Sequence, residues 1–336
     1  MALLIGIEGK QLQTADEARL RHPQTAGVIL FTRNFEDLAQ LCALTAAIRT
    51  IRADLLIAVD HEGGRVQRFR HEFTHLPEAA AFGRYFDHAP QGACEWAQAA
   101  GAIMGYELRR ADIDFSFAPV LDLQDAQSDV IGNRAFHAEP AAVALLSCAL
   151  RRGLRQMGMA AVGKHYPGHG RVQGDSHLML PCDRREYALR EADRFPFYAN
   201  IQDGVEAIMS AHIMLPEDDK PAGFSALCLQ SLRDMGFEGA IISDDLDMAG
   251  AKFFTNPAER VQAALDAGAD AAMICNTFAD INSALAQALH LPQPERSKAR
   301  LQALRARVLP AEQLAQDYAA AEEIYRRHHA RALAMA

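Results

Sequence analysis

The sequence predicts an α/β fold, a single (β/α)8 barrel of the TIM type formed by residues 1–336 as one domain. Eight short apolar runs recur along the chain, and they alternate with longer segments whose apolar residues return at helical spacing. The length of 336 residues also lies within the range of such barrels. We find no internal repeat, low-complexity segment or linker rich in Pro and Ser that would mark a second domain.

The eight expected strands read as nearly continuous apolar runs, such as LLIGIE and GVILF. Strands that are buried on both faces have this pattern, which is typical of a parallel sheet. The expected strands cover residues 3–8, 27–31, 55–60, 115–121, 159–164, 207–212, 239–244 and 271–276.

Helices are expected between these strands because apolar residues recur there at intervals of three and four. The clearest helical patterns cover residues 38–52, 94–110, 141–157, 186–202, 257–267 and 281–289. After the last of them, a C-terminal helical segment is expected over about 298–336. It consists of a short helix at 298–308, a break at Pro310, and a second helix from residue 311 onwards that packs on the barrel or frays.

Most of the expected strands end in a polar residue. In a (β/α)8 barrel the C-terminal ends of the strands surround the active site, so these residues predict a polar pocket. An Asp or Asn after a strand can also be a helix cap or a turn former, and for Asp122 both interpretations stay open because Gln124 and Asp125 follow it as in an ordinary loop. The polar strand ends are Glu8, Asp60, Asp122, Lys164 with His165, His212, Asp244 and Asn276.

Two of these ends lie in unusual surroundings. Asp60 opens the stretch DHEGGRVQR, in which Gly63 and Gly64 allow the backbone to approach another group closely. Asp244 lies in SDDLDM, where neighbouring carboxylates would raise the pKa of at least one of them in a closed site.

Composition limits the possible partners. The formal charge of −9 and the absence of basic blocks interleaved with aromatic residues argue against nucleic acid, so an uncharged or small-molecule partner fits better. The N-terminal apolar run is too short for a signal peptide, and no stretch approaches the ~20 apolar residues of a membrane span. We therefore expect a cytoplasmic protein that does not bind membranes. The six cysteines are scattered without CxxC spacing, and most of them lie in apolar helical or strand patterns, as reduced core thiols do. They are Cys42, Cys94, Cys148, Cys182, Cys228 and Cys275.

The stretch KHYPGHGRVQGDSH, residues 164–177, holds the densest group of titratable residues. In an extended segment residues i and i+2 point the same way, so Asp175 can bind one ring nitrogen of His177 and leave the other free to donate a proton. A carboxylate that faces a separate acid across a pocket is the arrangement of glycoside hydrolysis. His169, earlier in the same stretch, is expected to fasten the loop by a hydrogen bond.

Three other functions compete with this interpretation. A metal-dependent hydrolase would draw ligands from histidines such as His165, His169 and His212, but their spacing matches no familiar zinc motif, so no metal or other cofactor is expected. A Schiff-base lyase would use Lys164 as its amine nucleophile. A sugar-binding barrel without activity would not require both Asp244 and the pair of Asp175 and His177.

Six ordered motifs resemble glycoside hydrolase family 3, and specifically its single-domain bacterial β-N-acetylhexosaminidases of peptidoglycan recycling. Tyr166 departs from the family pattern, where Phe is common, but keeps the ring. The motifs are GVILFTRNF (27–35), AVDHEGGRVQR (58–68), FSFAPVLDL (115–123), IGNRAFH (131–137), KHYPGHGRVQGDSH (164–177) and IISDDLDMAG (241–250).

The resemblance implies roles for eight residues. Asp244 would be the nucleophile that forms a covalent glycosyl-enzyme, and His177 would be the proton donor and acceptor, oriented by Asp175. The residues implied to hold the nonreducing-end sugar are Asp60, Arg68, Arg134, Lys164 and His165.

The resemblance also implies the substrate, a nonreducing terminal β-linked N-acetylglucosamine on cell-wall fragments that end in a 1,6-anhydro-muramoyl peptide. Water is the expected acceptor. Phosphate stays open as a second acceptor, because a histidine acid would not repel it as a carboxylate would. The residues do not indicate an oligomeric state.

Overall fold

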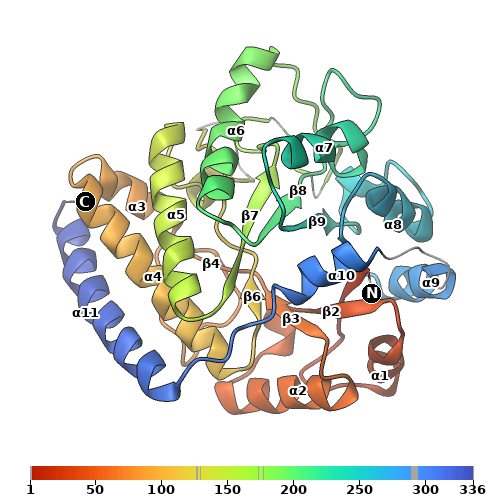
Figure 1. The fold of residues 1–336 in the computed structure, drawn as a ribbon, viewed down its shortest axis with the longest axis horizontal. Helices are drawn as coiled ribbons and strands as arrows, with labels where there is room; N and C mark the ends of the chain where they lie inside the picture. Colours follow the sequence, from red (N-terminus) through yellow and green to blue (C-terminus); the bar gives the residue numbers. More distant parts are fainter. Residues whose placement is uncertain are drawn as a thin grey trace.

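The computed structural model describes residues 2–125, 128, 130–172, 174–176, 178–288 and 294–335. Within these ranges eight parallel strands close into a barrel, in the order β1, β10, β9, β8, β7, β6, β3 and β2, which confirms the predicted (β/α)8 architecture (Figure 1). The strands are β1 (Leu3–Gly6), β2 (Thr25–Leu30), β3 (Leu56–Val59), β6 (Phe115–Ser116), β7 (Ala160–Tyr166), β8 (Ala207–Ser210), β9 (Ala240–Asp245) and β10 (Ala271–Ile274).

β6 is much shorter than the expected strand over residues 115–121. Pro119 lies in that run and has no N–H to donate to a regular ladder. The chain nevertheless stays beside β7, because the amide of Leu121 donates to the carbonyl of Lys164 at 2.6 Å and Val120 forms an isolated bridge with Lys164. The polar residue that follows, Asp122, therefore still lies at the same end of the barrel as Lys164.

Six helices match the expected ones to within a few residues: α2 (Leu38–Ile51), α4 (Pro90–Arg110), α5 (Pro140–Gln156), α6 (Tyr187–Gln202), α8 (Pro257–Asp266) and α9 (Phe278–Ala288). Three further helices were not among the clear patterns: α1 (Thr14–Arg21), α3 (Ala79–Phe86) and α7 (Ala226–Asp234). Each has only eight or nine residues, too few for periodicity to stand out. None of the described helices has both the length and the apolar character needed to cross a bilayer.

The C-terminal segment forms α10 (Glu295–Gln302) and α11 (Ala311–Met335), so the first helix starts and ends earlier than expected. α11 runs alongside α4 at the edge of the molecule (Figure 1). Trp96 of α4 lies against the rings of Tyr325 and His329, with centroids 6.1 and 5.6 Å away, and His328 donates or accepts a hydrogen bond with the Tyr85 hydroxyl. The tail therefore packs on the barrel helices.

A small hairpin follows β3 at the mouth of the barrel. Its strands are β4 (His61–Gly63) and β5 (Val66–Gln67), which pair antiparallel. Gly63 has a φ of 101°, and a Cβ there would lie 2.5 Å from the carbonyl oxygen of Pro77. The close approach predicted for the two glycines is therefore made to the chain around Pro77. The described residues also include four short 3-10 helices: η1 (Thr32–Asn34), η2 (Gly132–Arg134), η3 (Ala222–Phe224) and η4 (Ala249–Ala251).

Candidate active site

A cavity of about 410 Å³ lies at the C-terminal ends of the barrel strands, and we call it the central cavity. Its volume falls within the range of small-molecule sites. Its walls include apolar side chains from the strands, among them Ile29, Met209 and Met273. Six of the eight predicted site residues line it: Asp60, Arg68, Arg134, Lys164, His165 and Asp244.

Lys164 is the centre of a buried network of charges on one wall of the central cavity. Its side chain is 3% exposed, and its Nζ lies 2.9 Å from Asp60 Oδ1 and 2.6 Å from Glu62 Oε1. Burial alone would lower the pKa of Lys164, but Asp60 and Glu62 raise it above its usual value. Lys164 is therefore a fixed ammonium group.

Asp60 lies between Lys164 and Arg68, whose Nη2 is 3.4 Å from Asp60 Oδ2. Burial alone would raise the pKa of Asp60, but the two cations hold it below its usual range. Asp60 is therefore an ionised hydrogen-bond acceptor, and Lys164 and Arg68 are donors, which is a suitable wall for hydroxyl groups.

His165 is held in one orientation by a buried carboxylate. Its Nδ1 lies 2.7 Å from Oδ2 of Asp122, a carboxylate that is fully buried and also accepts from the backbone amide of His169 at 2.7 Å. Burial alone would raise the pKa of Asp122, but His165 and these hydrogen bonds lower it. An ionised Asp122 makes Nδ1 the protonated nitrogen and fixes which way Nε2 points.

Asp244 lies at the end of β9, on the wall formed by β9 and β10. Its Oδ1 accepts from the backbone amide of Asp245 at 2.7 Å. Burial raises the pKa of Asp245 to about 7, with further contributions from Asp247 and Asp244. The sequence predicted a raised pKa for at least one carboxyl of this cluster, and in the structure Asp245 is such a group.

The loop after β7 contains the predicted acid/base pair. His177 lies outside the described residues. Asp175 is partly buried, and its neighbour Ser176 is anchored twice, through its Oγ to His169 Nε2 at 3.1 Å and through its carbonyl, which accepts from the Gly250 amide at 2.8 Å. The hydrogen bond expected of His169 is therefore present, and it ties the loop to the chain that follows β9.

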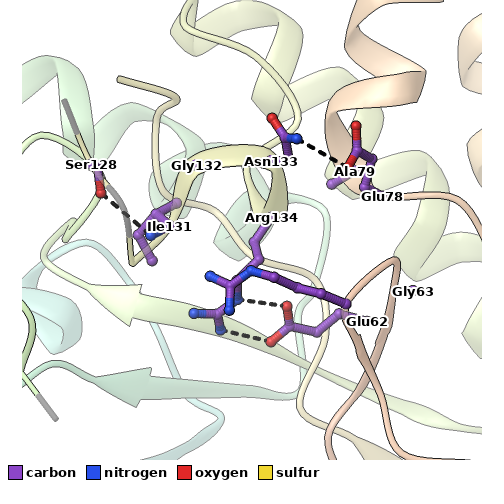
Figure 2. A pocket seen from close by; sticks show the side chains of 10 residues that line it. Glu62, Gly63, Glu78, Ala79, Ser128, Ile131, Gly132, Asn133 and Arg134 are labelled. Atoms are coloured by element: carbon purple, nitrogen blue, oxygen red, sulfur yellow. Dashed lines mark hydrogen bonds and ion pairs between the residues drawn. The ribbon is translucent and has the colours of Figure 1, made fainter. Parts of the chain in front are cut away.

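A second cavity of about 300 Å³ adjoins the central cavity and shares Glu62, Arg65 and Arg134 with it. Figure 2 shows Arg134, from η2, facing Glu62 of the hairpin through two parallel interactions. Arg134 Nε donates to Glu62 Oε2 at 2.9 Å, and Nη2 donates to Oε1 at 2.8 Å. This bidentate pair lines both cavities.

Two residues of this architecture were missed or left open from the sequence. Glu62 was not singled out, although Asp60 and Glu62 are two residues apart in an extended stretch and such residues point the same way. For Asp122 the sequence left open whether it belongs to an ordinary loop or to the site. Its complete burial beside His165 places it in the site.

The remaining polar strand ends have other contacts. Glu8 accepts from Arg19 at 3.0 Å, and His212 is buried against the ring of Phe224. Asn276 lines the central cavity and donates to Asp245 Oδ2 at 3.1 Å. No group of three His, Cys, Asp or Glu side chains with the geometry of a metal site occurs among the residues that the structure describes.

The chain matches the model of the family described as "Glycosyl hydrolase family 3 N terminal domain" over residues 3–310. A protein of Nitrosospira multiformis named β-hexosaminidase is 49% identical over 313 residues, which are 92% of this chain and 89% of that protein. A β-hexosaminidase of Neisseria meningitidis is 46% identical over 280 residues, 82% of this chain and 78% of the relative.

Solved structures with a similar fold are also known. The crystal structure of NagZ from Neisseria gonorrhoeae in complex with N-trifluoroacetyl-D-glucosamine superposes with a TM-score of 0.89 at 39% identity, over 97% of each chain. A family 3 β-N-acetylglucosaminidase from Paenibacillus sp. reaches 0.83 at 29% identity, over 96% of this chain and 67% of that one. With the family model matching most of its length, the chain belongs to glycosyl hydrolase family 3, among the glycoside hydrolases whose members are named β-hexosaminidase.

Proposed function

We propose that this protein is a retaining exo-β-N-acetylglucosaminidase that removes a nonreducing terminal, β-1,4-linked N-acetylglucosamine from peptidoglycan fragments. The observation that carries the proposal is that Asp244 shares the central cavity with fixed hydrogen-bonding groups, among them Lys164 and His165. One side of the cavity suits sugar hydroxyls and the other holds a carboxylate. The names of the relatives support a hexosamine as the sugar.

Asp244 acts as the nucleophile in this proposal. Its carboxylate attacks the anomeric carbon, the bond to the leaving oxygen breaks, and a glycosyl ester forms on the enzyme; water then cleaves that ester with retention of configuration. The amide of Asp245 binds one oxygen of Asp244 at 2.7 Å and so orients the other.

His177 supplies the proton. As general acid it protonates the leaving oxygen in the first step, and as general base it takes a proton from water in the second, with Asp175 holding its ring. The anchoring of Ser176 to His169 and Gly250 supports this role, because it holds the loop next to the chain that follows Asp244.

The sugar of the nonreducing end is assigned to Asp60, Arg68, Arg134, Lys164 and His165. The raised pKa of Lys164 argues against the Schiff-base alternative, which needs a neutral amine. An ammonium between two carboxylates is a hydrogen-bond donor and not a nucleophile.

The nucleophile is tested by labelling with a slow fluorosugar substrate and locating the adduct by mass spectrometry. The parent protein and Asp245→Asn should be labelled on Asp244, and Asp244→Asn should not be labelled. A label on Asp245 in the parent protein would show that Asp245, and not Asp244, is the nucleophile.

The acid role is tested with leaving groups of different acidity. His177→Ala should slow cleavage of poor leaving groups sharply and of activated aryl groups least, because activated groups need little protonation. The exposed His88 gives a matched control, since His88→Ala should behave like the parent protein. An equal loss for all leaving groups would contradict the role.

The substrate is expected to be a cytoplasmic muropeptide with a 1,6-anhydro-muramoyl leaving side, which places the protein in cell-wall recycling, with indirect effects on cell shape and division. Comparing aryl β-glycosides of N-acetylglucosamine, N-acetylgalactosamine and glucose tests the sugar. Measuring sugar-1-phosphate at high phosphate tests whether phosphate competes with water.

A further inference from the structure

Glu62 is the only carboxylate among the described residues that touches both Lys164 and Arg134. Its side chain is 7% exposed, its Oε1 is 2.6 Å from Lys164 Nζ and 2.8 Å from Arg134 Nη2, and its Oε2 accepts from Arg134 Nε at 2.9 Å. Burial alone would raise the pKa of Glu62, but Arg134 and Lys164 hold it far below its usual range. Glu62 is therefore a buried anion between two buried cations.

The hydrogen-bond donors of the two cations are divided between Glu62 and the central cavity. Lys164 has three N–H groups, of which one points to Asp60 and one to Glu62, so one remains. Arg134 has five, and the edge formed by Nε and Nη2 is used by Glu62. One Nη1–H of Arg134 donates to the Val130 carbonyl at 3.4 Å. Both residues line the central cavity, so the other remaining donors are the ones that a bound sugar meets.

Without Glu62 the positions of Lys164 and Arg134 at the central cavity would be unstable. Arg134 lowers the pKa of Lys164 because the two cations repel each other, and Glu62 raises that pKa because it attracts Lys164. Two buried like charges that lose their shared anion separate or draw in water. The positions of the donors therefore depend on Glu62.

The backbone also holds Glu62 in place. It is the middle residue of β4, in a hairpin whose turn is tied down by a hydrogen bond from the Gly64 amide to the carbonyl of Leu76 at 2.9 Å. Figure 2 shows Glu62 reaching from this hairpin to Arg134.

We propose that Glu62 is a positioning residue for sugar recognition: it sets the geometry of Lys164 and Arg134 together, and sugar affinity depends on it. The proposal rests on the proposed function, because it assumes that the central cavity binds the sugar. Glu62 acts through the two cations and takes no part in the bond changes at the anomeric carbon.

The test compares Glu62→Gln, Glu62→Asp and a control, Glu78→Gln. Glu78 lines only the second cavity of the two and binds Arg84 and Asn133, each at 3.1 Å, and it forms no ion pair with Lys164 or Arg134 among the described contacts. For each protein, kcat and KM are measured on an aryl β-N-acetylglucosaminide, Kd is measured for free N-acetylglucosamine by calorimetry, and Tm is measured by thermal unfolding.

Glu62→Gln should raise KM and Kd at least tenfold, with a smaller loss in kcat. Glu62→Asp keeps the charge but is one methylene too short to hold both partners, so its Kd should lie between those of the parent and Glu62→Gln. Glu78→Gln should match the parent.

A purely structural ion pair would behave differently, since Tm would fall while Kd of the folded protein stayed at the parent value, and that result would overturn the proposal. If Glu62→Gln does not fold, the Kd of Glu62→Asp decides alone, and a parent-like value overturns the proposal. A parent protein that neither cleaves the glycoside nor binds the sugar would instead overturn the proposed function, and the positioning role with it.

Discussion

Replacing Asp122 with Asn should reverse the tautomer of His165. Asp122 is fully buried and accepts three hydrogen bonds, from His165 Nδ1 at 2.7 Å, the His169 amide at 2.7 Å and the His165 amide at 3.4 Å. Both amides bind Oδ1, so in the Asp122→Asn protein the side-chain oxygen keeps them and the new NH2 group faces Nδ1. Two donors then oppose each other, and the ring relieves the conflict by moving its proton to Nε2.

The size of the effect follows from the hydrogen bond that Nε2 of His165 no longer accepts from the sugar once it carries the proton. Leaving a buried donor or acceptor without its partner costs about 1–3 kcal/mol, and tenfold corresponds to about 1.4 kcal/mol, so kcat/KM should fall by roughly 5- to 150-fold. The isosteric side chain leaves no cavity. The loss should therefore be much larger in kcat/KM than in the fraction of folded protein.

Two assays read this out. Nitrogen NMR of the histidine rings reports the His165 tautomer, and hydrolysis of an aryl β-N-acetylglucosaminide gives kcat/KM, with circular dichroism as the check on folding. If the tautomer reverses and kcat/KM stays at the parent value, Nε2 of His165 makes no contact that matters to the substrate. If the tautomer does not change, the reasoning from Asp122 is refuted.

Three further substitutions test other parts of the structure. Gly63→Ala places a Cβ 2.5 Å from the Pro77 carbonyl oxygen in a residue with a φ of 101°. The substitution should destabilise the fold by about 1–3 kcal/mol and lower the Tm, and an unchanged Tm would contradict this prediction. Asp245 has a folded pKa of about 7, above its unfolded value, so its ionisation destabilises the fold increasingly as pH rises from about 4 to about 7. The free energy of unfolding of Asp245→Asn minus that of the parent, measured with urea, should therefore increase from about pH 4 to about pH 7 and level off above pH 7. A difference that does not change with pH would contradict this prediction. Tyr166→Phe removes a hydrogen bond of 2.5 Å to Ser231 and should lower the free energy of unfolding by about 0.5–1.5 kcal/mol with kcat/KM unchanged, and a large loss of activity would contradict it.

The fold was predictable because strands buried on both faces leave a strong apolar signal, as in residues 27–31 and 271–276. Short helices such as α1 and α7 were missed because their packing against the barrel, and not their own periodicity, stabilises them. β6 ended early because Pro119 cannot donate to the ladder.

The site was predictable where strand ends deliver polar residues to one rim, as they do for Asp60, Lys164 and Asp244. Glu62 was harder to find, because a three-residue strand in a hairpin leaves no pattern and its importance comes from partners 72 and 102 positions away, Arg134 and Lys164. Contacts between residues so distant in sequence are set by the closure of the barrel.

The contact between α4 and α11 has a practical consequence. Trp96 is the chain's single tryptophan, and it lies against Tyr325 and His329 of the C-terminal helix. Indole emission responds to the rings around it, so the fluorescence of this protein reports the docking of α11 from one known position. A change in emission that precedes the loss of far-ultraviolet ellipticity on heating would mark detachment of the C-terminal helix as a step separate from melting of the barrel, without any added label.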